Sequence, residues 1–234
     1  MSRYASRLCL SLLLLSLSAA GHARPDSGAL SPEQILALYG EEVVFEVERA
    51  GRPIGSHQLR FSREGEHLRV EVEMALQIRF LGIFSYHYRY RASESWQDGR
   101  LQSLQVTVDD NGKQQQLMAR ADGEVLQLEM DGQTRELPAG LLTTNHWHPA
   151  ILQQQQVLNT LTGEASQIAV HALGEIMVPR AGDLIPARHY RLGGELQDTE
   201  TWYDDQGRWL GMEFSARDNS RIRLINRQIG GQRG

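Results

Sequence analysis

The chain has 234 residues, of which 41% are hydrophobic and 23% charged, and its formal net charge is −5. A chain of this length buries an ordinary hydrophobic core as a single domain. The acidic balance and the lack of clustered basic residues exclude a nucleic-acid surface, so we expect no nucleic-acid partner.

Residues 1–23 have the pattern of a secretory signal peptide. Two arginines precede an apolar run from Leu8 to Leu17, and small residues lead to a cleavage site after Ala23, with cleavage after Gly21 as the alternative. The run is short for a membrane span, and no second apolar run follows it. We therefore expect a periplasmic protein, exported through a cleaved signal peptide and without a transmembrane span after cleavage. The alternative is an uncleaved anchor.

The chain has one cysteine, Cys9, and it lies inside this leader. The mature chain is therefore free of cysteine, although its compartment permits disulfides. This excludes a disulfide framework, a thiolate nucleophile and a Cys-based zinc site.

Residues 24–39 form a polar lead-in to the mature chain. Ser31 followed by Pro32 is typical of a helix start, because serine caps free N–H groups and proline suits the first turn. The pattern predicts a short helix that runs to Leu38. Residues 40–229 are expected to form a single β-rich domain, and residues 230–234 a flexible tail.

After the lead-in, apolar residues recur with a period of two, which predicts strands. The longest alternation runs from Leu68 to Phe80 and predicts one long strand, buried along the whole of its apolar face. The dipeptides Asp98–Gly99 and Asn111–Gly112 are typical of hairpin turns, and strands resume after Glu164. This spacing predicts a mainly all-β fold. We expect a curved antiparallel β-meander, half-barrel or barrel-like, that encloses one short helix.

The enclosed helix is expected within Leu141–Glu164. A proline suits its first turn, and Ala150–Val157 contains good helix formers without a glycine. Trp147, Ile151 and Leu158 can share one side of a helix at this spacing. A short helix between two runs of strands has to bury its apolar side against a sheet, so we expect this segment to organise the interior.

His146 and His148 are the weak candidates for a metal site. On a strand their side chains would point the same way, whereas on a helix or a turn they diverge. A zinc site needs a third and usually a fourth ligand, and no HExxH or comparable pairing supplies them. We favour capping and packing at the start of the helix. We expect no cofactor, and keep a metal-binding protein or a hydrolase that uses these histidines as a remote alternative.

Other catalytic patterns are weak as well. There is no G-x-S-x-G elbow, and the carboxylate pairs Asp109–Asp110 and Asp204–Asp205 fall in predicted turns. Aspartate is common in turns because its side chain bonds to the local backbone. We therefore expect a non-enzymatic protein and no catalytic residue.

Tyr86, Tyr88 and Tyr90 alternate along one predicted strand and allow two interpretations. In the first, the rings pack across strands and the hydroxyls reach polar groups at the rim. In the second, they form an amphipathic wall for an apolar or glycan ligand, together with Trp147 and Ile151.

Five stretches carry recognisable turn and packing residues. They are FEVERAGRPIGSHQLRF (Phe45–Phe61), SYHYRYRASESWQDGRL (Ser85–Leu101), DDNG (Asp109–Gly112), NHWHPAIL with LNTLTGE, and RHYRLGGELQDTETWYDDQGRWLGMEF (Arg188–Phe214). Together they resemble an uncharacterised family of exported bacterial proteins, known only as a domain of unknown function. The last stretch is also similar to a broader group of exported β-proteins. The resemblance spans most of residues 40–227 and implies a curved antiparallel sheet around a short central helix. It implies no reaction, cofactor or catalytic residue, and as a fold it extends loosely to periplasmic lipoprotein carriers and lipocalin-like cups.

Two functions follow from this pattern. The first is a periplasmic binding or carrier module that holds a lipid or other apolar ligand between helix and sheet. The alternative is a structural or envelope-assembly protein with a packed interior and a protein partner. The state of the space between the helix and the sheet, empty or filled, distinguishes the two.

Overall fold

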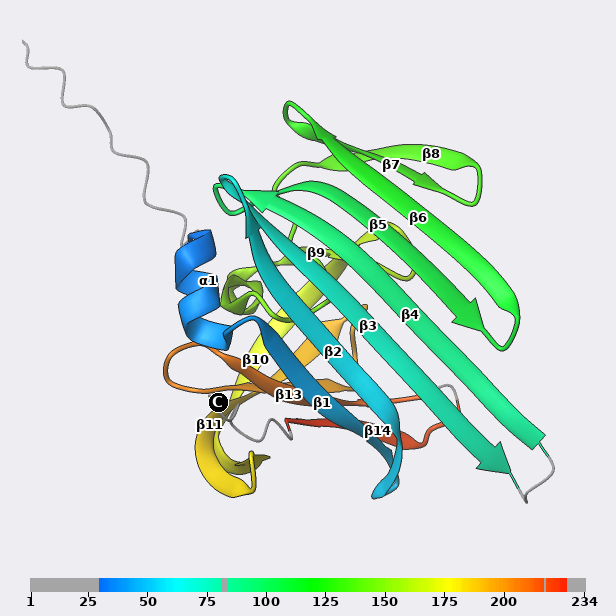
Figure 1. The fold of residues 1–234 in the computed structure, drawn as a ribbon, viewed down its shortest axis with the longest axis vertical. Helices are drawn as coiled ribbons and strands as arrows, with labels where there is room; N and C mark the ends of the chain where they lie inside the picture. The colour runs from blue at the N-terminus through cyan, green and yellow to red at the C-terminus, as the bar shows by residue number, and fades with distance from the viewer. Residues whose placement is uncertain (1–29, 81–83, 217, 227–234) are drawn as a thin grey trace, which may run out of the picture.

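The computed structural model describes residues 30–80, 84–216 and 218–226 (Figure 1). The expected signal peptide, residues 1–23, and the expected C-terminal tail, residues 230–234, lie outside these residues. Within them, antiparallel strands build one large sheet, in the order β8-β7-β6-β5-β4-β3-β2-β1-β14-β13-β12-β11-β10-β9. The strands are β1 (Glu42–Arg49), β2 (Arg52–Glu64), β3 (His67–Phe80), β4 (Phe84–Gln97), β5 (Arg100–Asp110), β6 (Lys113–Asp122), β7 (Val125–Met130), β8 (Gln133–Pro138), β9 (Gln156–Asn159), β10 (Glu164–Arg180), β11 (Asp183–Gly194), β12 (Thr199–Tyr203), β13 (Trp209–Ser215) and β14 (Arg221–Asn226).

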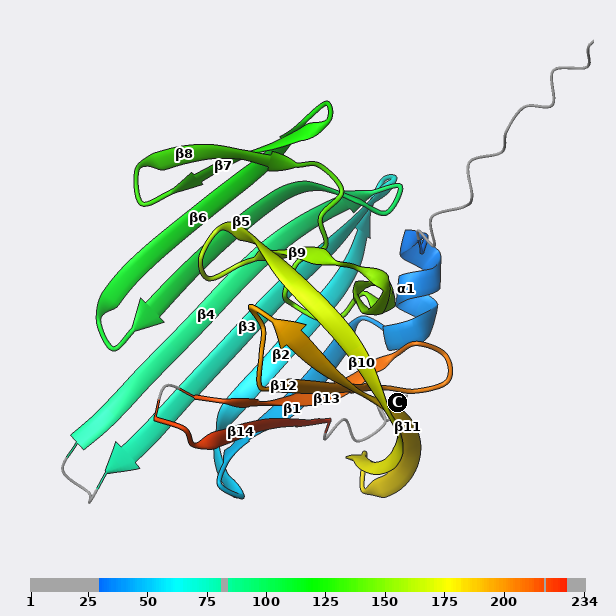
Figure 2. The same ribbon diagram turned by 180° about the vertical axis from the view of Figure 1, so that it is seen from behind.

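The sheet is two meanders joined along one seam, where β1 pairs with β14. The meander β1–β8 forms a broad curved layer, and β9–β14 forms a smaller layer that faces it (Figures 1 and 2). The segment that joins β8 to β9 runs between the two layers (Figure 2). This confirms the expected barrel-like antiparallel fold and places the connecting segment in its interior.

The expected helix in the lead-in is confirmed as α1 (Pro32–Tyr39). Ser31 and Gln34 form a capping box, in which each side chain bonds to the other residue's backbone N–H. Ile35 is buried, and the ring of Tyr39 stacks on Phe61 of β2 at 4.9 Å between ring centroids. α1 therefore covers one end of the barrel-like core.

The long strand predicted from Leu68 onward is β3, but its apolar face is not buried along its whole length. Leu68, Val70 and Val72 are buried, whereas Met74 and Leu76 are only half-buried. One reason is the neighbouring strand, which presents Gly55, without a side chain, opposite Leu76. The prediction of a continuously buried face was wrong for the second half of the strand.

The helix expected over Ala150–Val157 is also shorter than predicted. A single 3-10 turn covers Pro149–Gln153, and the chain is extended again from Gln154 into β9. Backbone bonds to a neighbouring stretch hold β9 in this conformation: the Leu158 N–H donates to the Leu142 carbonyl at 2.8 Å, and the Thr144 N–H donates to the Leu158 carbonyl at 3.1 Å. These tertiary bonds override the local helix preference.

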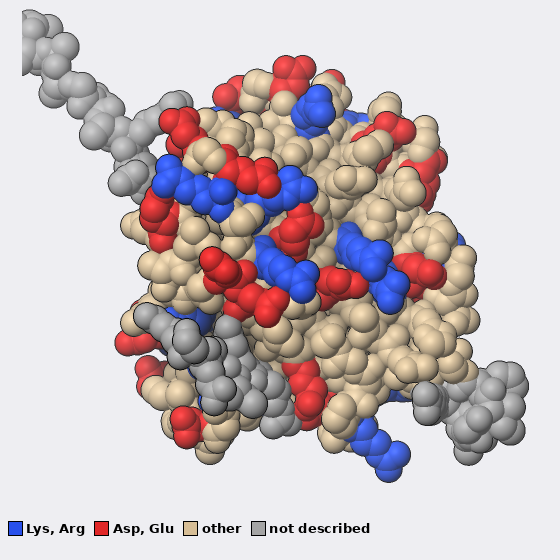
Figure 3. All heavy atoms as spheres, viewed as in Figure 1, with Lys and Arg blue, Asp and Glu red and all other residues tan. Residues whose placement is uncertain are grey.

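None of the helices in the described ranges is long and apolar enough to cross a bilayer. The outer face of the β1–β8 layer carries charges of both signs, interspersed rather than gathered by sign (Figure 3). Many of them form ion pairs across neighbouring strands, such as Arg60 with Glu42 at 3.0 Å and Arg91 with Glu73 at 3.3 Å. Exposed pairs of this kind contribute little stability.

Candidate functional site

A buried carboxylate stands at the centre of the interior. Glu94 lies on β4, points inward and is 0% exposed. The indole N–H groups of Trp96 and Trp147 both donate to its Oε2 at 2.9 Å. The Thr143 hydroxyl and the Asn145 amide donate to its Oε1 at 2.8 and 2.6 Å. Each carboxylate oxygen thus accepts two hydrogen bonds.

This arrangement suits the ionised form of Glu94. Burial raises the pKa of the carboxyl group, and the four hydrogen bonds, led by that from Asn145, act in the opposite direction. Indole and amide N–H groups only donate, so three of the four partners have no acceptor to offer a protonated acid. The donor set therefore stabilises a carboxylate that would otherwise be costly to bury.

Three of the four donors belong to the segment Leu141–Thr160, which we call the plug because it runs between the two layers (Figure 2). Tyrosines from the surrounding elements hold its backbone. The hydroxyl of Tyr39 on α1 donates to the Trp147 carbonyl at 2.5 Å, and that of Tyr203 on β12 donates to the His146 carbonyl at 2.8 Å. The plug is thus tied to α1, to β4 and to the smaller layer at once.

Trp147 is the main apolar group of the plug and is 1% exposed. Its ring meets Trp96 edge to face at 5.4 Å and Phe61 at 5.9 Å between centroids. Ile151 and Leu158 are fully buried as well. The three residues expected to share a helix side do share the core, although they reach it from a loop, a 3-10 turn and a strand.

Two hollows on the described surface lie outside this interior. One is lined by residues of β6, of β7 and of the turn between β7 and β8, and the other by residues of β2 to β5 around Ala75 and Arg89. Neither is lined by a plug residue, and both are open to solvent. Between the plug and the sheet, the side chains of Trp147, Ile151, Leu158 and Glu94 are buried.

The two candidate metal ligands point apart. His146 has a left-handed backbone (φ 62°), and its ring stacks on Trp209 at 5.9 Å. His148 caps the 3-10 turn, where its Nδ1 accepts from the Ala150 N–H at 3.2 Å, and its ring lies beside Trp147. The capping expected of this pair is confirmed for His148. In the described part of the chain, no group of three or more His, Cys, Asp or Glu side chains is placed to hold a metal ion.

A third buried histidine, His57 on β2, faces the same tryptophan as His146. Its ring meets Trp209 edge to face at 5.8 Å, and neither ring nitrogen has a hydrogen-bond partner. Burial, with a smaller contribution from His146, lowers the pKa of His57 to about 3, and burial lowers the pKa of His146 to about 4. Both imidazoles are therefore neutral at pH 7.

The tyrosine ladder on β4 divides along the strand. Tyr90 is buried, and its hydroxyl donates to Asn145 and Thr160 of the plug at 2.9 and 3.0 Å. Tyr88 is half-buried, and the Tyr86 hydroxyl donates to Asp110 at 2.5 Å near the far end of the strand. Tyr90 thus bonds to the plug, whereas Tyr86 has the rim contact expected of cross-strand packing. Only Tyr86 and Tyr88 lie away from the plug.

Sequence reasoning missed Glu94, Tyr39 and Tyr203. A signal existed for Glu94, because it occupies an inward position of β4 between Ala92 and Trp96, where an apolar residue is expected. No comparable signal marks the two tyrosines, since their partners are backbone carbonyls more than fifty positions away.

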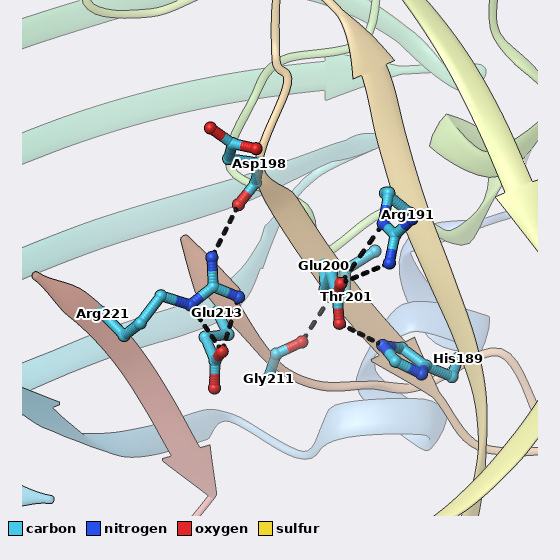
Figure 4. A network of polar contacts seen from close by, with 8 residues as sticks. All are labelled: His189, Arg191, Asp198, Glu200, Thr201, Gly211, Glu213 and Arg221. Carbon is cyan, nitrogen blue, oxygen red and sulfur yellow. Dashed lines mark hydrogen bonds and ion pairs between the residues drawn. The ribbon is translucent and has the colours of Figure 1, made fainter. Parts of the chain in front are cut away.

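The outer face of the smaller layer carries a separate polar network (Figure 4). Glu200 on β12 accepts from Arg191 at 3.1 Å and lies 2.8 Å from His189 Nε2, and Glu213 on β13 accepts from Arg221 at 2.7 Å. Glu200 and Glu213 thus each pair with a basic side chain on a neighbouring strand, as in ordinary cross-strand pairing. We assign it a structural role.

Comparisons with known proteins agree with this fold. No curated protein matches the chain. A crystal structure of a β-barrel-like protein of the domain of unknown function DUF1849 from Brucella abortus is similar, with a TM-score of 0.56, 8% sequence identity, and coverage of 79% of this chain and 94% of that one. This likeness shows the fold alone. The family model for the domain of unknown function DUF6134 matches residues 45–227, which include β4, the plug and both layers, and the chain belongs to that family.

Proposed function

We propose that this protein is an exported, non-enzymatic structural or envelope-assembly protein, which acts through a protein partner at its surface. The observation that carries the proposal is the plug. A cup that holds a lipid needs free apolar space, and here that space is occupied by buried side chains anchored on Glu94. The leader pattern of residues 1–23 supports export to the periplasm.

A carrier of an apolar ligand is the second candidate, restricted to the far ends of β3 and β4. There, Met74, Leu76 and Tyr88 are half-buried apolar side chains on the concave face, beyond the reach of the plug's hydrogen bonds. A ligand at this place would lie on the sheet rather than inside it.

Native mass spectrometry of protein purified from the periplasmic fraction, without detergent, tests both candidates. We expect the mass of the chain shortened by its leader, with no bound lipid. A retained lipid would favour the carrier and contradict the structural proposal. Recovery of the uncut chain in the membrane pellet would contradict the export that both candidates require.

A further inference from the structure

β10 has a strand on only one side for much of its length. β11 pairs with it along Ile168–Arg180. On the other side, β9 pairs only with Glu164–Gln167, and β14 pairs only at Arg180. In the described structure, the stretch between these two contacts is an open sheet edge, on the near side in Figure 2.

The hydrogen bonds at the start of β10 show which residues face this edge. The Ile168 N–H donates to the Gln155 carbonyl at 2.9 Å, on the side away from β11. The backbone groups of alternate residues in a strand point to the same side. Val170 and Ala172 therefore also present their N–H and C=O groups to the open edge.

The turn at the other end of β10 gives the same information for the second half. Ala181 and Gly182 both have positive φ (51° and 94°), as in a two-residue type I′ hairpin, whose flanking pair Arg180–Asp183 is the bonded one. By alternation, Glu175 and Met177 face the open edge. The edge-facing residues of the two halves are therefore separated by three positions, from Ala172 to Glu175, because a bulge lies between Ala172 and Gly174.

The side chains around the edge are unusually apolar for a surface. Three of the five large hydrophobic residues exposed in the described chain lie on the β10–β11 hairpin: Leu173, Met177 and Leu184, at 41%, 56% and 64% exposure. The stretch from His171 to Glu175 is exposed at every position. An uncovered strand edge with exposed apolar side chains is a template for pairing with another strand.

We propose that β10 pairs along this edge with β10 of a second copy of this chain, antiparallel, about a two-fold axis between Leu173 and Gly174. The edge-facing residues are symmetric about that point. Val170 of each copy then lies opposite Met177 of the other, and Ala172 opposite Glu175. Every open backbone group gains a partner without an offset, and the two Glu175 carboxylates do not face each other.

The ends of the edge fit this pairing. β9 covers β10 up to Gln167, and Pro179, which has no N–H to donate, closes the other end. A bulge and a charged residue usually blunt an isolated edge. Here the two bulges coincide at the axis, so both copies share one interruption. An interface of this kind is isologous and closes as a dimer. The formation of this dimer does not depend on whether the protein carries a ligand.

Sedimentation of the mature chain tests the proposal, with Leu173→Lys as the disrupting variant. We expect a dimer for the wild type and a monomer for Leu173→Lys, because two ammonium groups would meet near the axis. Met118→Lys is the matched control, since Met118 is also an exposed strand residue (48%), on β6. It should remain dimeric. Urea unfolding of both variants checks that the fold of each is intact.

The lack of cysteine in the mature chain allows a direct check of the geometry. Under mild oxidation, Leu173→Cys should form a disulfide-linked dimer, and Met118→Cys should not. A monomeric wild type at the highest soluble concentration overturns the proposal. So does a dimer that Leu173→Lys leaves intact, or equal cross-linking of the two cysteine variants. These outcomes leave the lipid measurement above unaffected.

Discussion

Glu94 shows how one side chain can organise a protein interior. A buried carboxylate is costly unless it is fully hydrogen-bonded, and here two tryptophans, a threonine and an asparagine supply the donors. Since three of these donors come from the plug, the carboxylate determines where the plug lies. The interaction is specific as well as stabilising, because any displacement of the plug leaves a charge unpaired.

Replacing Glu94 with glutamine tests this role with little change in shape. The glutamine amide would direct an NH₂ group at donors that cannot accept, so the free energy of unfolding should fall by about 2–4 kcal/mol in urea titrations. Glu73→Gln is the control. It changes an outer glutamate paired with Arg91, and should stay within about 0.5 kcal/mol of the wild type. Equal effects of the two changes would show that Glu94 has no special role.

The buried histidines predict a loss of stability in mild acid. The pKa of His57 is about 3 in the fold and 6.5 as its ordinary value, so the unfolded chain binds the extra proton below pH 6.5. Stability should therefore fall as pH falls from about 6.5 towards 3, by up to roughly 1.4 kcal/mol per pH unit for this residue. His146, with a pKa of about 4, adds to the loss between 6.5 and 4. The pKa of Glu94 is raised in the fold, so protonation of Glu94 favours the folded state and opposes this loss as the pH falls.

His57→Phe isolates the first contribution, because phenylalanine matches the aromatic surroundings and has no nitrogen to leave unpaired. Urea unfolding from pH 7.5 to 4.5 should show a shallower loss of stability than in the wild type. Parallel curves for the variant and the wild type would contradict the buried neutral imidazole.

At the scale of elements, the plug is held by packing and hydrogen bonds together. Trp147→Ala removes the ring contacts with Trp96 and Phe61 and one donor to Glu94. Its free energy of unfolding should fall by about 3–5 kcal/mol. Leu161→Ala, just beyond the plug and 46% exposed, is the control and should cost less than about 1 kcal/mol. An unchanged urea midpoint for Trp147→Ala would mean that the plug does not support the fold.

Strand β3 gives a graded prediction along its length. Val72→Asp should unfold the domain, because Val72 is 2% exposed and an unpaired charge cannot be solvated there. Leu76→Asp, at a half-buried position opposite Gly55, should cost less, on the order of 1–2 kcal/mol. Glu73→Ala on the outer face should be nearly neutral. Circular dichroism of the three variants checks the order, and a folded Val72→Asp would show that the strand register is wrong.

The elements themselves could be predicted where the signal is local. The period-two pattern of β3, the Ser31 cap of α1 and the hairpin dipeptides all depend on neighbouring residues, and each appears in the structure. The 3-10 turn and β9 could not be predicted in this way, because Val157 and Leu158 are held extended by bonds to the chain near Leu142. In this stretch, tertiary hydrogen bonds outweigh the local helix preference.

At the scale of the whole molecule, the sequence predicted the barrel-like meander but not the centre of its interior. The sequence points to both Trp147 and Tyr90, yet the groups that hold Trp147 in place, the Glu94 carboxylate and the Tyr39 hydroxyl, come from β4 and α1, far away along the chain. Tyr203 reaches His146 across 57 positions and Tyr39 reaches Trp147 across 108. Hydrogen bonds between residues so far apart leave no periodic pattern in the sequence. The single clue was a glutamate at an inward position.

We infer that the plug is part of the folded core and is not a lid that opens. Hydrogen exchange of the indole N–H groups of Trp147 and Trp96, followed by NMR, measures this most directly, because both protons are bonded to Glu94. We predict that they exchange only through global unfolding, with the free energy found by urea titration, and that added lipid vesicles leave the rates unchanged. Rapid exchange of Trp147, while backbone amides of β4 stay protected, would show that the plug opens in the native state and is not part of the folded core.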